Sequence, residues 1–288
     1  MDPAVSGVPQ RFPAPAKLNL FLHVVGRRPD GYHELQTLFR FLKYDDELEI
    51  TARVDGHIVL TEPLPGVAQE QDLCWRAARL LQMHTGCALG ADIRLIKRLP
   101  MGGGLGGGSS DAATVLLVLN RIWALDLSRE ALQSLGLQLG ADVPIFVYGQ
   151  TAFAEGVGDV LQPLALPPAV YVVLIPPVAV STRAVFSHPD LTRDTPRLTI
   201  APLMEGAWQD DRTHNDLEPL VARLYPEVAA ALVWLSQYGA ARMTGSGACC
   251  FVACDSREEA ERIFALRPSG MHGFVAEGLD QHPLFEIV

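Results

Sequence analysis

Hydrophobic and polar residues alternate along several short segments of the chain, which is the pattern of half-buried β-strands. The clearest segment spans residues 16–25, and the turn at 29–31 predicts a return strand over residues 35–42. Residues 47–54 and 57–61, separated by an Asp-Gly turn, predict a second hairpin. Further strands are expected over residues 91–98, 143–148, 151–154, 170–175, 248–254 and 273–277. The chain is therefore expected to begin as a β meander.

Longer apolar runs and capping residues predict helices between these strands. Gly86 is a stop signal, Ser128 is a typical N-cap, and Pro226 breaks one helical segment into a pair. Helices are expected over residues 71–84, 112–125, 129–140, 216–238 and 257–266, with an irregular surface segment over 187–213. This order predicts an α+β protein with mixed sheets and helices packed on one face.

The length of 288 residues suits two domains. The composition changes at the proline-rich stretch 163–168, which favours a domain boundary there. Residues 1–16 contain four prolines and no apolar core, so they are expected to be a loose N-terminal extension. The expected domains are then residues 17–165 and 166–288.

A glycine-rich segment is the most distinctive feature of the chain, with six glycines in the seven positions 102–108. It lies between the strand predicted over 91–98 and the helix predicted over 112–125. A helix N-terminus has unpaired backbone N–H groups and a positive dipole end, and glycine lets an anion approach the backbone closely. The segment is therefore predicted to bind phosphate, since a flexible linker would not be framed in this way.

Common nucleotide-binding loops fit this segment poorly. A Walker loop would need Gly-Lys-Ser/Thr, which does not occur, and the strand and loop motifs of a protein kinase are also absent. Gly102, Gly104 and Gly107 formally match the dinucleotide fingerprint, but Asp126 follows the helix without an intervening strand. An NAD-dependent oxidoreductase therefore remains only a minor alternative.

The run at 100–113 resembles the second motif of the GHMP kinases, a family of small-molecule kinases. Residues 15–20 and 243–248 resemble the first and third motifs, so the resemblance covers nearly the whole chain. It implies a two-domain GHMP kinase fold with the active site in the cleft between the domains, and it implies ATP and Mg2+. The residues implied in ATP binding are Pro100, Met101, Gly102, Gly103, Gly104, Leu105, Gly106, Gly107, Gly108, Ser109 and Ser110.

Two residues are implied by the resemblance to be catalytic, Lys17 and Asp142. Period-two alternation places Lys17 and Asn19 on one face of the first strand with Phe21 and His23, although a strand lysine is usually solvent-exposed. From the sequence alone, Asp142 is equally well a turn or N-cap residue. The resemblance implies that Asp142 accepts a hydroxyl proton, and that Lys17 holds Asp142 ionised and contacts the transferred phosphoryl group.

Residues after the turn at 29–31 indicate the substrate. Tyr32 and His33 could be packed loop anchors, but they match a family member whose small-molecule substrate is linked to cytidine diphosphate. There the tyrosine stacks on cytosine and the histidine recognises the base edge. The resemblance adds further substrate-binding residues, Asn19, Thr182, Phe186, Gly245 and Ser246. Alternatives are a GHMP kinase acting on mevalonate or homoserine, or a nucleotide-binding module without catalysis.

No carboxylate cluster predicts a metal site, so Mg2+ is implied only by the ATP chemistry, and Asp111 is expected simply to cap its helix. The formal net charge of −10 argues against nucleic-acid or acidic-membrane binding. The five cysteines are odd in number and lack metal spacing, which indicates reduced thiols, a cytoplasmic location and no structural zinc. Prolines interrupt the longest apolar stretch, so no membrane span is expected. A monomer or weak homodimer is expected.

Overall fold

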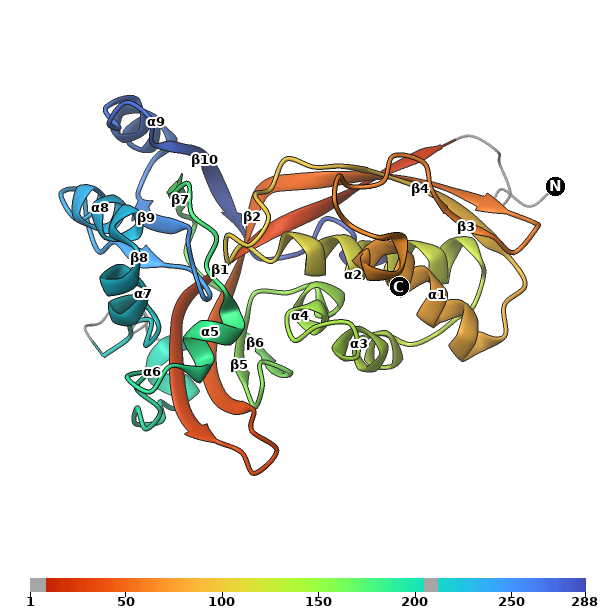
Figure 1. Cartoon of the computed structure of the whole chain (residues 1–288), viewed down its shortest axis with the longest axis horizontal. Helices are drawn as coiled ribbons and strands as arrows, with labels where there is room; N and C mark the ends of the chain where they lie inside the picture. The colour runs from red at the N-terminus through yellow and green to blue at the C-terminus, as the bar shows by residue number, and fades with distance from the viewer. Residues whose placement is uncertain (1–8, 205–211) are drawn as a thin grey trace.

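The computed structural model describes residues 9–204 and 212–288, which form the mixed α/β arrangement of Figure 1. The strands are β1 (Gln10–Arg27), β2 (His33–Arg53), β3 (Ile58–Leu60), β4 (Gly90–Ile96), β5 (Ala152–Glu155), β6 (Val160–Pro163), β7 (Val170–Ile175), β8 (Arg242–Met243), β9 (Cys250–Cys254) and β10 (His272–Leu279). The α-helices are α1 (Leu73–Thr85), α2 (Gly107–Ile122), α3 (Arg129–Leu137), α4 (Val143–Tyr148), α5 (Thr182–Ser187), α6 (Ile200–Met204), α7 (Glu218–Leu224), α8 (Pro226–Leu235) and α9 (Arg257–Ala265). Short 3-10 helices span Gln69–Gln71 and Phe285–Ile287.

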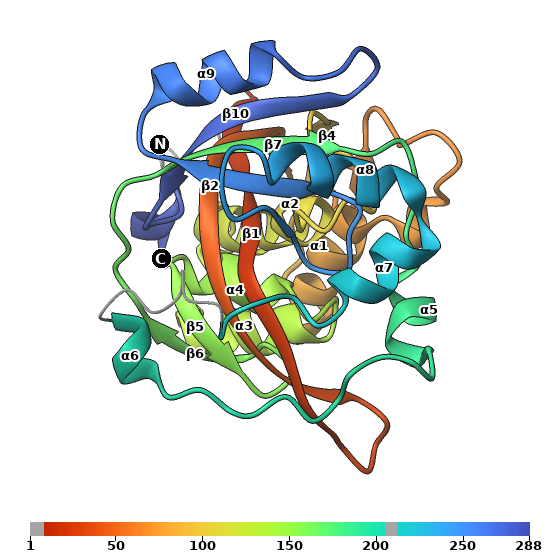
Figure 2. The ribbon, with the colours of Figure 1, turned by 90° about the vertical axis from the view of Figure 1, so that its left-hand side faces the viewer.

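A long antiparallel hairpin of β1 and β2 runs through the middle of the molecule (Figure 2). Strand β2 also pairs with β4 and β5, and β10 pairs with both β2 and β7, so the strands form one continuous mixed sheet. Helices α1 to α4 lie against the half of the sheet that contains β4, whereas α8 and α9 cover the outer face of β7, β9 and β10. The expected mixed α+β fold is thereby confirmed.

Strand β1 contributes to all three hydrophobic cores of the described residues. Ala14 packs in the core under α1 to α4, and Val24 packs in the core under α5 and α7 to α9. Leu18 and Leu20 belong to a third core, between the hairpin and the inner face of β7, β9 and β10. Full burial of such a side chain contributes about 1.5–3 kcal/mol, so β1 is strongly held along its length.

Several predicted elements are corrected by the structure. Residues 10–16 are not a loose extension but the start of β1, paired with β2; residues 1–8 lie outside the described part. The hairpin of 47–54 and 57–61 is wrong, because β3 pairs in parallel with β4 instead. Residues 143–148 form helix α4 and not a strand, since a short apolar run does not distinguish the two and Pro144 suits a first helical turn.

The start of α2 and the regularity of β1 also differ from the prediction. Helix α2 begins at Gly107 and not at 112, so the last glycines lie within its first turn. Strand β1 has an irregularity between Asn19 and Leu22 that ends the simple alternation, and Phe21 joins the third core with Leu18. Strand β7 begins at Val170, while the domain boundary expected near residue 165 stays a prediction.

Candidate active site

A cleft of about 530 Å³ is lined by segments from distant parts of the chain. These are β1, the glycine segment, the residues before α4, the start of α5, and the turn between β8 and β9. Residues from both sides of position 165 therefore line it. The predicted site residues in its lining are Lys17, Asn19, Pro100, Met101, Gly102, Gly103, Gly104, Gly106, Gly107, Gly108, Ser109, Asp142, Thr182, Phe186, Gly245 and Ser246.

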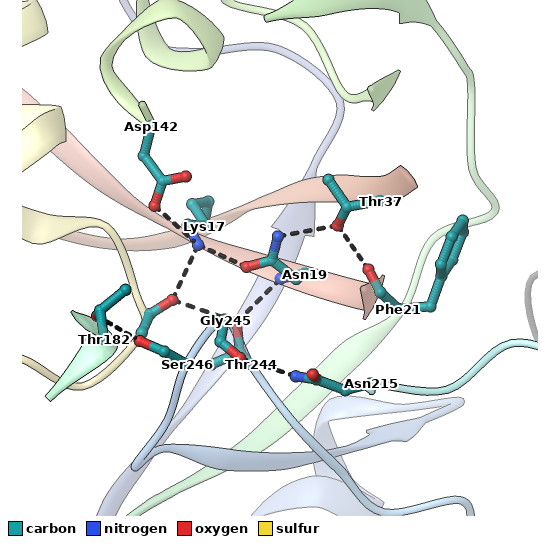
Figure 3. Close-up of polar contacts among 11 residues, drawn as sticks. Lys17, Asn19, Phe21, Thr37, Asp142, Thr182, Asn215, Thr244, Gly245 and Ser246 are labelled. Atoms are coloured by element: carbon teal, nitrogen blue, oxygen red, sulfur yellow. Dashed lines mark hydrogen bonds and ion pairs between the residues drawn. The ribbon is translucent and has the colours of Figure 1, made fainter. Parts of the chain in front are cut away.

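Lys17 is at the centre of the polar contacts in this cleft (Figure 3). Its side chain is 2% exposed, and its Nζ lies 2.5 Å from Asn19 Oδ1, 3.0 Å from the Gly104 carbonyl oxygen and 3.1 Å from Asp142 Oδ2. An ammonium has three N–H donors, and these three acceptors occupy them all. A phosphoryl oxygen can therefore accept a hydrogen bond from Lys17 only if one of these three acceptors is displaced.

Asp142 holds the N-cap position of α4 but does not cap the helix with its side chain. The carboxylate turns toward Lys17 and is 38% exposed, so one of its oxygens faces the ammonium while the group still contacts the cleft. Asp142 is therefore the N-cap residue of α4 by position only, and its side chain does not cap the helix. A carboxylate held by a buried cation and open to a cleft is suited to accept a proton.

A network of amide and hydroxyl groups fixes the orientation of Asn19. Its Nδ2 donates to Thr37 Oγ1 at 2.9 Å, and its backbone N–H donates to Thr244 Oγ1 at 2.9 Å. With Oδ1 occupied by Lys17, the buried Asn19 side chain positions the lysine rather than facing the cleft freely. Sequence reasoning missed Thr37, as well as Asn215, which donates to the carbonyls of Met243 and Gly245.

The glycine segment meets the protein itself at very short range. A Cβ on Gly104, where φ is +79°, would lie 2.1 Å from the Thr244 carbonyl oxygen. A Cβ on Gly106, where φ is +73°, would lie 2.8 Å from the Phe146 ring and 3.1 Å from Lys17 Cε. These glycines are therefore required by backbone conformation and by packing next to the lysine, in addition to any ligand.

Helix α2 presents its N-terminus to the cleft, and its N-cap Gly106 has no side chain to satisfy the first amides. Gly107, Gly108 and Ser109 of this first turn line the cleft, where the helix dipole favours an anion. Leu105 and Ser110 are buried and lie outside the lining, so their implied part in ATP binding stays a prediction. Within the described residues, the Ser110 Oγ has no hydrogen-bond partner.

Asp111 does not cap α2, contrary to expectation, but lies buried within it. Its Oδ2 is 2.9 Å from Lys97 Nζ, and the same nitrogen is 2.5 Å from Asp46 Oδ2. Burial, together with the neighbouring Asp46 carboxylate, raises the pKa of Asp111 to about 8, against the opposing effect of Lys97. Asp46, Lys97 and Asp111 therefore join β2, the segment after β4, and helix α2, and both Lys97 and Asp111 also line the cleft.

The part of the cleft formed by α1 and β4 has several apolar walls beside the polar residues Asp72 and Lys97, and sequence reasoning missed it. Its walls include Leu64, Val67, Leu73 and Leu95. These residues come from the long connection after β3, from α1 and from β4, and no local motif marks them. Apolar walls next to an anion-binding helix end suit a ligand with a flat base and a phosphate chain.

A second pocket of about 840 Å³ adjoins the first and contains the remaining predicted residues, Tyr32 and His33. The His33 and Phe186 rings lie 5.1 Å apart, and Phe186 lines both pockets. The Tyr32 side chain is 66% exposed, so Tyr32 is not a packed loop anchor. Three aromatic rings at one pocket are suited to hold a planar base.

His33 has a partner that sequence reasoning missed, because it lies in the irregular segment after α5. Arg193 Nε donates to His33 Nε2 at 3.1 Å. Burial, followed by the charges of Arg193 and Arg27, lowers the pKa of His33. His33 is therefore neutral near pH 7.

Other observations limit the chemistry of the chain. In the described ranges, no group of three or more His, Cys, Asp or Glu residues could hold a metal, and no helix has the length and apolarity needed to span a bilayer. All five cysteines are free, as expected, although Cys87 is only partly buried. The oxidoreductase alternative is excluded by topology, because α2 is followed by α3 and not by the second strand of a dinucleotide-binding unit.

A cleft of this kind, with a glycine-rich helix start beside a lysine and an aspartate, defines a phosphotransferase class of site. Residues 72–150 match the family model described as GHMP kinases N terminal domain, and residues 196–265 match that of the GHMP kinases C terminal. The chain belongs to the GHMP kinases, and it is an ATP-dependent small-molecule kinase.

The similar proteins are more specific. The chain is 60% identical to a 4-diphosphocytidyl-2-C-methyl-D-erythritol kinase of Thiobacillus denitrificans, covering 97% of this chain and 99% of that one. It is 57% identical to a protein of the same name from Aromatoleum aromaticum, covering 94% of each. A crystal structure of a 4-(cytidine 5'-diphospho)-2C-methyl-D-erythritol kinase is 34% identical, with a TM-score of 0.81, covering 93% of this chain and 99% of that chain.

Proposed function

We propose that the chain transfers the γ-phosphoryl group of ATP to the 2-hydroxyl of 4-diphosphocytidyl-2-C-methyl-D-erythritol, giving the 2-phosphate and ADP. The names of its relatives support this substrate. The observation that carries the proposal is the Lys17 and Asp142 pair, 3.1 Å apart beside the glycine segment, in a cleft that adjoins an aromatic pocket.

The nucleotide fits the cleft in one direction. The apolar walls at Leu73 and Leu95 suit the adenine ring, and the amides of Gly107 to Ser109 suit its phosphates. This arrangement directs the terminal phosphate toward Lys17 and Asp142. Pre-organised amides at this point would stabilise charge that builds up on the transferring group.

The catalytic step requires a base and a fixed geometry. The substrate hydroxyl oxygen attacks the terminal phosphorus while its proton moves to the Asp142 carboxylate, and the bond to the ADP oxygen breaks. Lys17 orients the Asp142 carboxylate through their ion pair, and Asn19 holds Lys17 through their 2.5 Å contact. Lys17 reaches the phosphoryl group by exchanging one of its three present acceptors, of which the Gly104 carbonyl belongs to the loop that holds the phosphates.

Mg2+ fits the residues near the start of α2 without a dedicated protein site. Mg2+ keeps several waters and is held by phosphate oxygens plus one or two protein groups. The Ser109 side chain borders the cleft at the start of α2, so its hydroxyl would serve as such a group. When bound with ATP, the cation neutralises charge on the outer phosphates.

The second pocket accounts for the cytidine. Tyr32 and Phe186 provide faces for the base, and His33 lies at its edge. Thr182 and Ser246, whose hydroxyl oxygens are 2.7 Å apart, lie between this pocket and the catalytic pair. A mevalonate or homoserine substrate would leave these rings without a function, so the pocket favours a substrate carrying a nucleobase.

The test is an assay of phosphate transfer with ATP, Mg2+ and a panel of alcohols. The panel contains the cytidine-linked erythritol, free 2-C-methylerythritol, mevalonate and homoserine. We expect transfer to the cytidine-linked alcohol with a kcat/KM at least a hundredfold above that for any other, since each lacks the base contacts worth about 1–3 kcal/mol per ring. Equal or better transfer to mevalonate or homoserine would refute the proposal.

A further inference from the structure

Arg193 joins two walls of the base pocket. Its guanidinium donates to four backbone carbonyls, those of Phe186 at 3.0 Å, His188 at 2.7 Å, Leu191 at 2.9 Å and Pro189 at 3.5 Å. The remaining donor, Nε, contacts His33 Nε2 at 3.1 Å. These four bonds to the backbone fix the plane of the guanidinium, so the direction of the Nε–H bond is fixed as well. Arg193 thus connects the α5 wall to the first residue of β2.

This contact determines which nitrogen of His33 carries the proton. An arginine nitrogen is always a donor, so His33 Nε2 must be an acceptor. A neutral imidazole with one acceptor nitrogen is protonated on the other, and an imidazolium would place two donors face to face. His33 is therefore the tautomer protonated on Nδ1. Across residues 9–204 and 212–288, this Nδ1 has no hydrogen-bond partner, so it remains available to a ligand.

A donor at this point distinguishes the two pyrimidines. The N3 atom of cytosine is an acceptor, whereas the N3 of uracil carries a hydrogen and is a donor. A His33 Nδ1–H directed at this edge would bond to cytosine and would oppose uracil. A mismatched polar edge is costly because the groups have lost water without gaining a partner.

We propose that Arg193 is a positioning residue for base specificity, which holds His33 in the Nδ1–H tautomer and so selects a cytosine edge over a uracil edge. The inference rests on the proposed function for the identity of the substrate. The tautomer itself is a property of the ligand-free protein, so the two can be tested separately.

The tautomer is measured by NMR on ring-¹⁵N-histidine protein without ligand, near pH 7.5. The His33 signals are identified by their loss in His33→Gln. We expect the pattern of a proton on Nδ1 in the native protein, and a mixture of tautomers in Arg193→Met. A proton on Nε2 in the native protein, or an unchanged pattern in Arg193→Met, would overturn the inference whatever the substrate proves to be.

The specificity is measured as the ratio of kcat/KM for the cytidine-linked and the uridine-linked substrate. We expect Arg193→Met to lower this ratio by roughly tenfold or more, the value of one matched hydrogen bond, and Arg193→Lys to restore part of it. Arg121→Met is the matched control, because the Arg121 side chain is exposed, lies outside both pockets and makes no hydrogen bond or ion pair within the described residues. Its ratio should stay at the native value.

The outcomes separate the possible failures. Equal loss of rate on both substrates in Arg193→Met, with an unchanged ratio, would mean that Arg193 only supports the 186–191 segment and would refute the inference. Failure of the native protein to phosphorylate either substrate would refute the proposed function instead, and the NMR result would still decide the tautomer.

Discussion

Replacing Asp142 by asparagine tests the catalytic centre with a minimal change of shape. The amide oxygen can still accept from Lys17 Nζ, now 3.1 Å from the carboxylate, but the side chain can no longer take up a proton at neutral pH. General base catalysis contributes about 10²–10⁴-fold to a rate. We therefore expect kcat to fall by about 10²–10⁴-fold, or roughly 3–5 kcal/mol in activation free energy.

The same substitution also lowers the free energy of unfolding, by an amount that depends on how deeply the Lys17–Asp142 pair is buried. Lys17 is almost fully buried but Asp142 is 38% exposed, so the pair lies between a surface ion pair and a buried one. We expect a loss of about 1–2 kcal/mol in the free energy of unfolding, between the values for those two classes. A domain with about 5–15 kcal/mol of stability remains folded after such a loss, so the fall in kcat cannot be attributed to unfolding.

The assay couples ADP release to NADH oxidation, with urea unfolding of the same samples. The KM for ATP should stay within about threefold of the native value, because the substitution leaves in place the amides of α2 that are proposed to bind phosphate. Asp126→Asn is the matched control: it removes the same charge from an exposed loop residue outside the cleft, where Asn tolerates the positive φ of 52°. A kcat for Asp142→Asn within threefold of that of Asp126→Asn would refute the proposed role.

Further predictions concern the base pocket, the glycine loop and pH. Tyr32→Ala should raise the KM for the cytidine substrate by roughly 5- to 150-fold, the equivalent of about 1–3 kcal/mol of stacking. An equal rise in the KM for ATP would contradict a role of Tyr32 in the base pocket. Gly104→Ala should lower the thermal midpoint and abolish activity, because its Cβ would overlap the Thr244 carbonyl; a native midpoint would contradict the loop geometry. Burial lowers the pKa of His282 to about 3, so the unfolded state alone gains a proton below pH 6.5 and stability should fall as the pH decreases. Urea unfolding at pH 6.5 and at pH 5 measures this fall in the free energy of unfolding, which should be about 2 kcal/mol smaller in His282→Gln than in the native protein. An equal fall in the two proteins would refute the lowered pKa of His282.

The fold was predictable wherever a local signal matched a local structure. Gly86 ends α1 in a left-handed conformation, and the Ser128 side chain caps α3 by accepting from Ala131 N–H. Failures came where tertiary context decides. The apolar run 143–148 is fully consistent with a strand until its packing under α2 and α3 is known, and the pairing of β3 with β4 depends on a partner more than thirty residues away.

The site was predictable where motifs are contiguous. The resemblance located Lys17, Asp142 and the glycine segment, which the structure places together. Thr37 and Arg193 could not be found in this way, because each acts through a single side-chain contact with a residue far away in sequence. Likewise, nothing in the sequence near Asp111 signals that Lys97 and Asp46 surround it, and its position near a helix start predicts only a cap.

The partners of Lys17 come from β1, the loop before α2 and the residue before α4, and Asn19 adds a tie to Thr244 near the end of the chain. None of these segments holds the ammonium alone. Enzymatic activity should consequently be an all-or-nothing property of the complete chain: neither half separated near residue 165 should retain any, and heat inactivation should follow the same curve as loss of the whole tertiary structure.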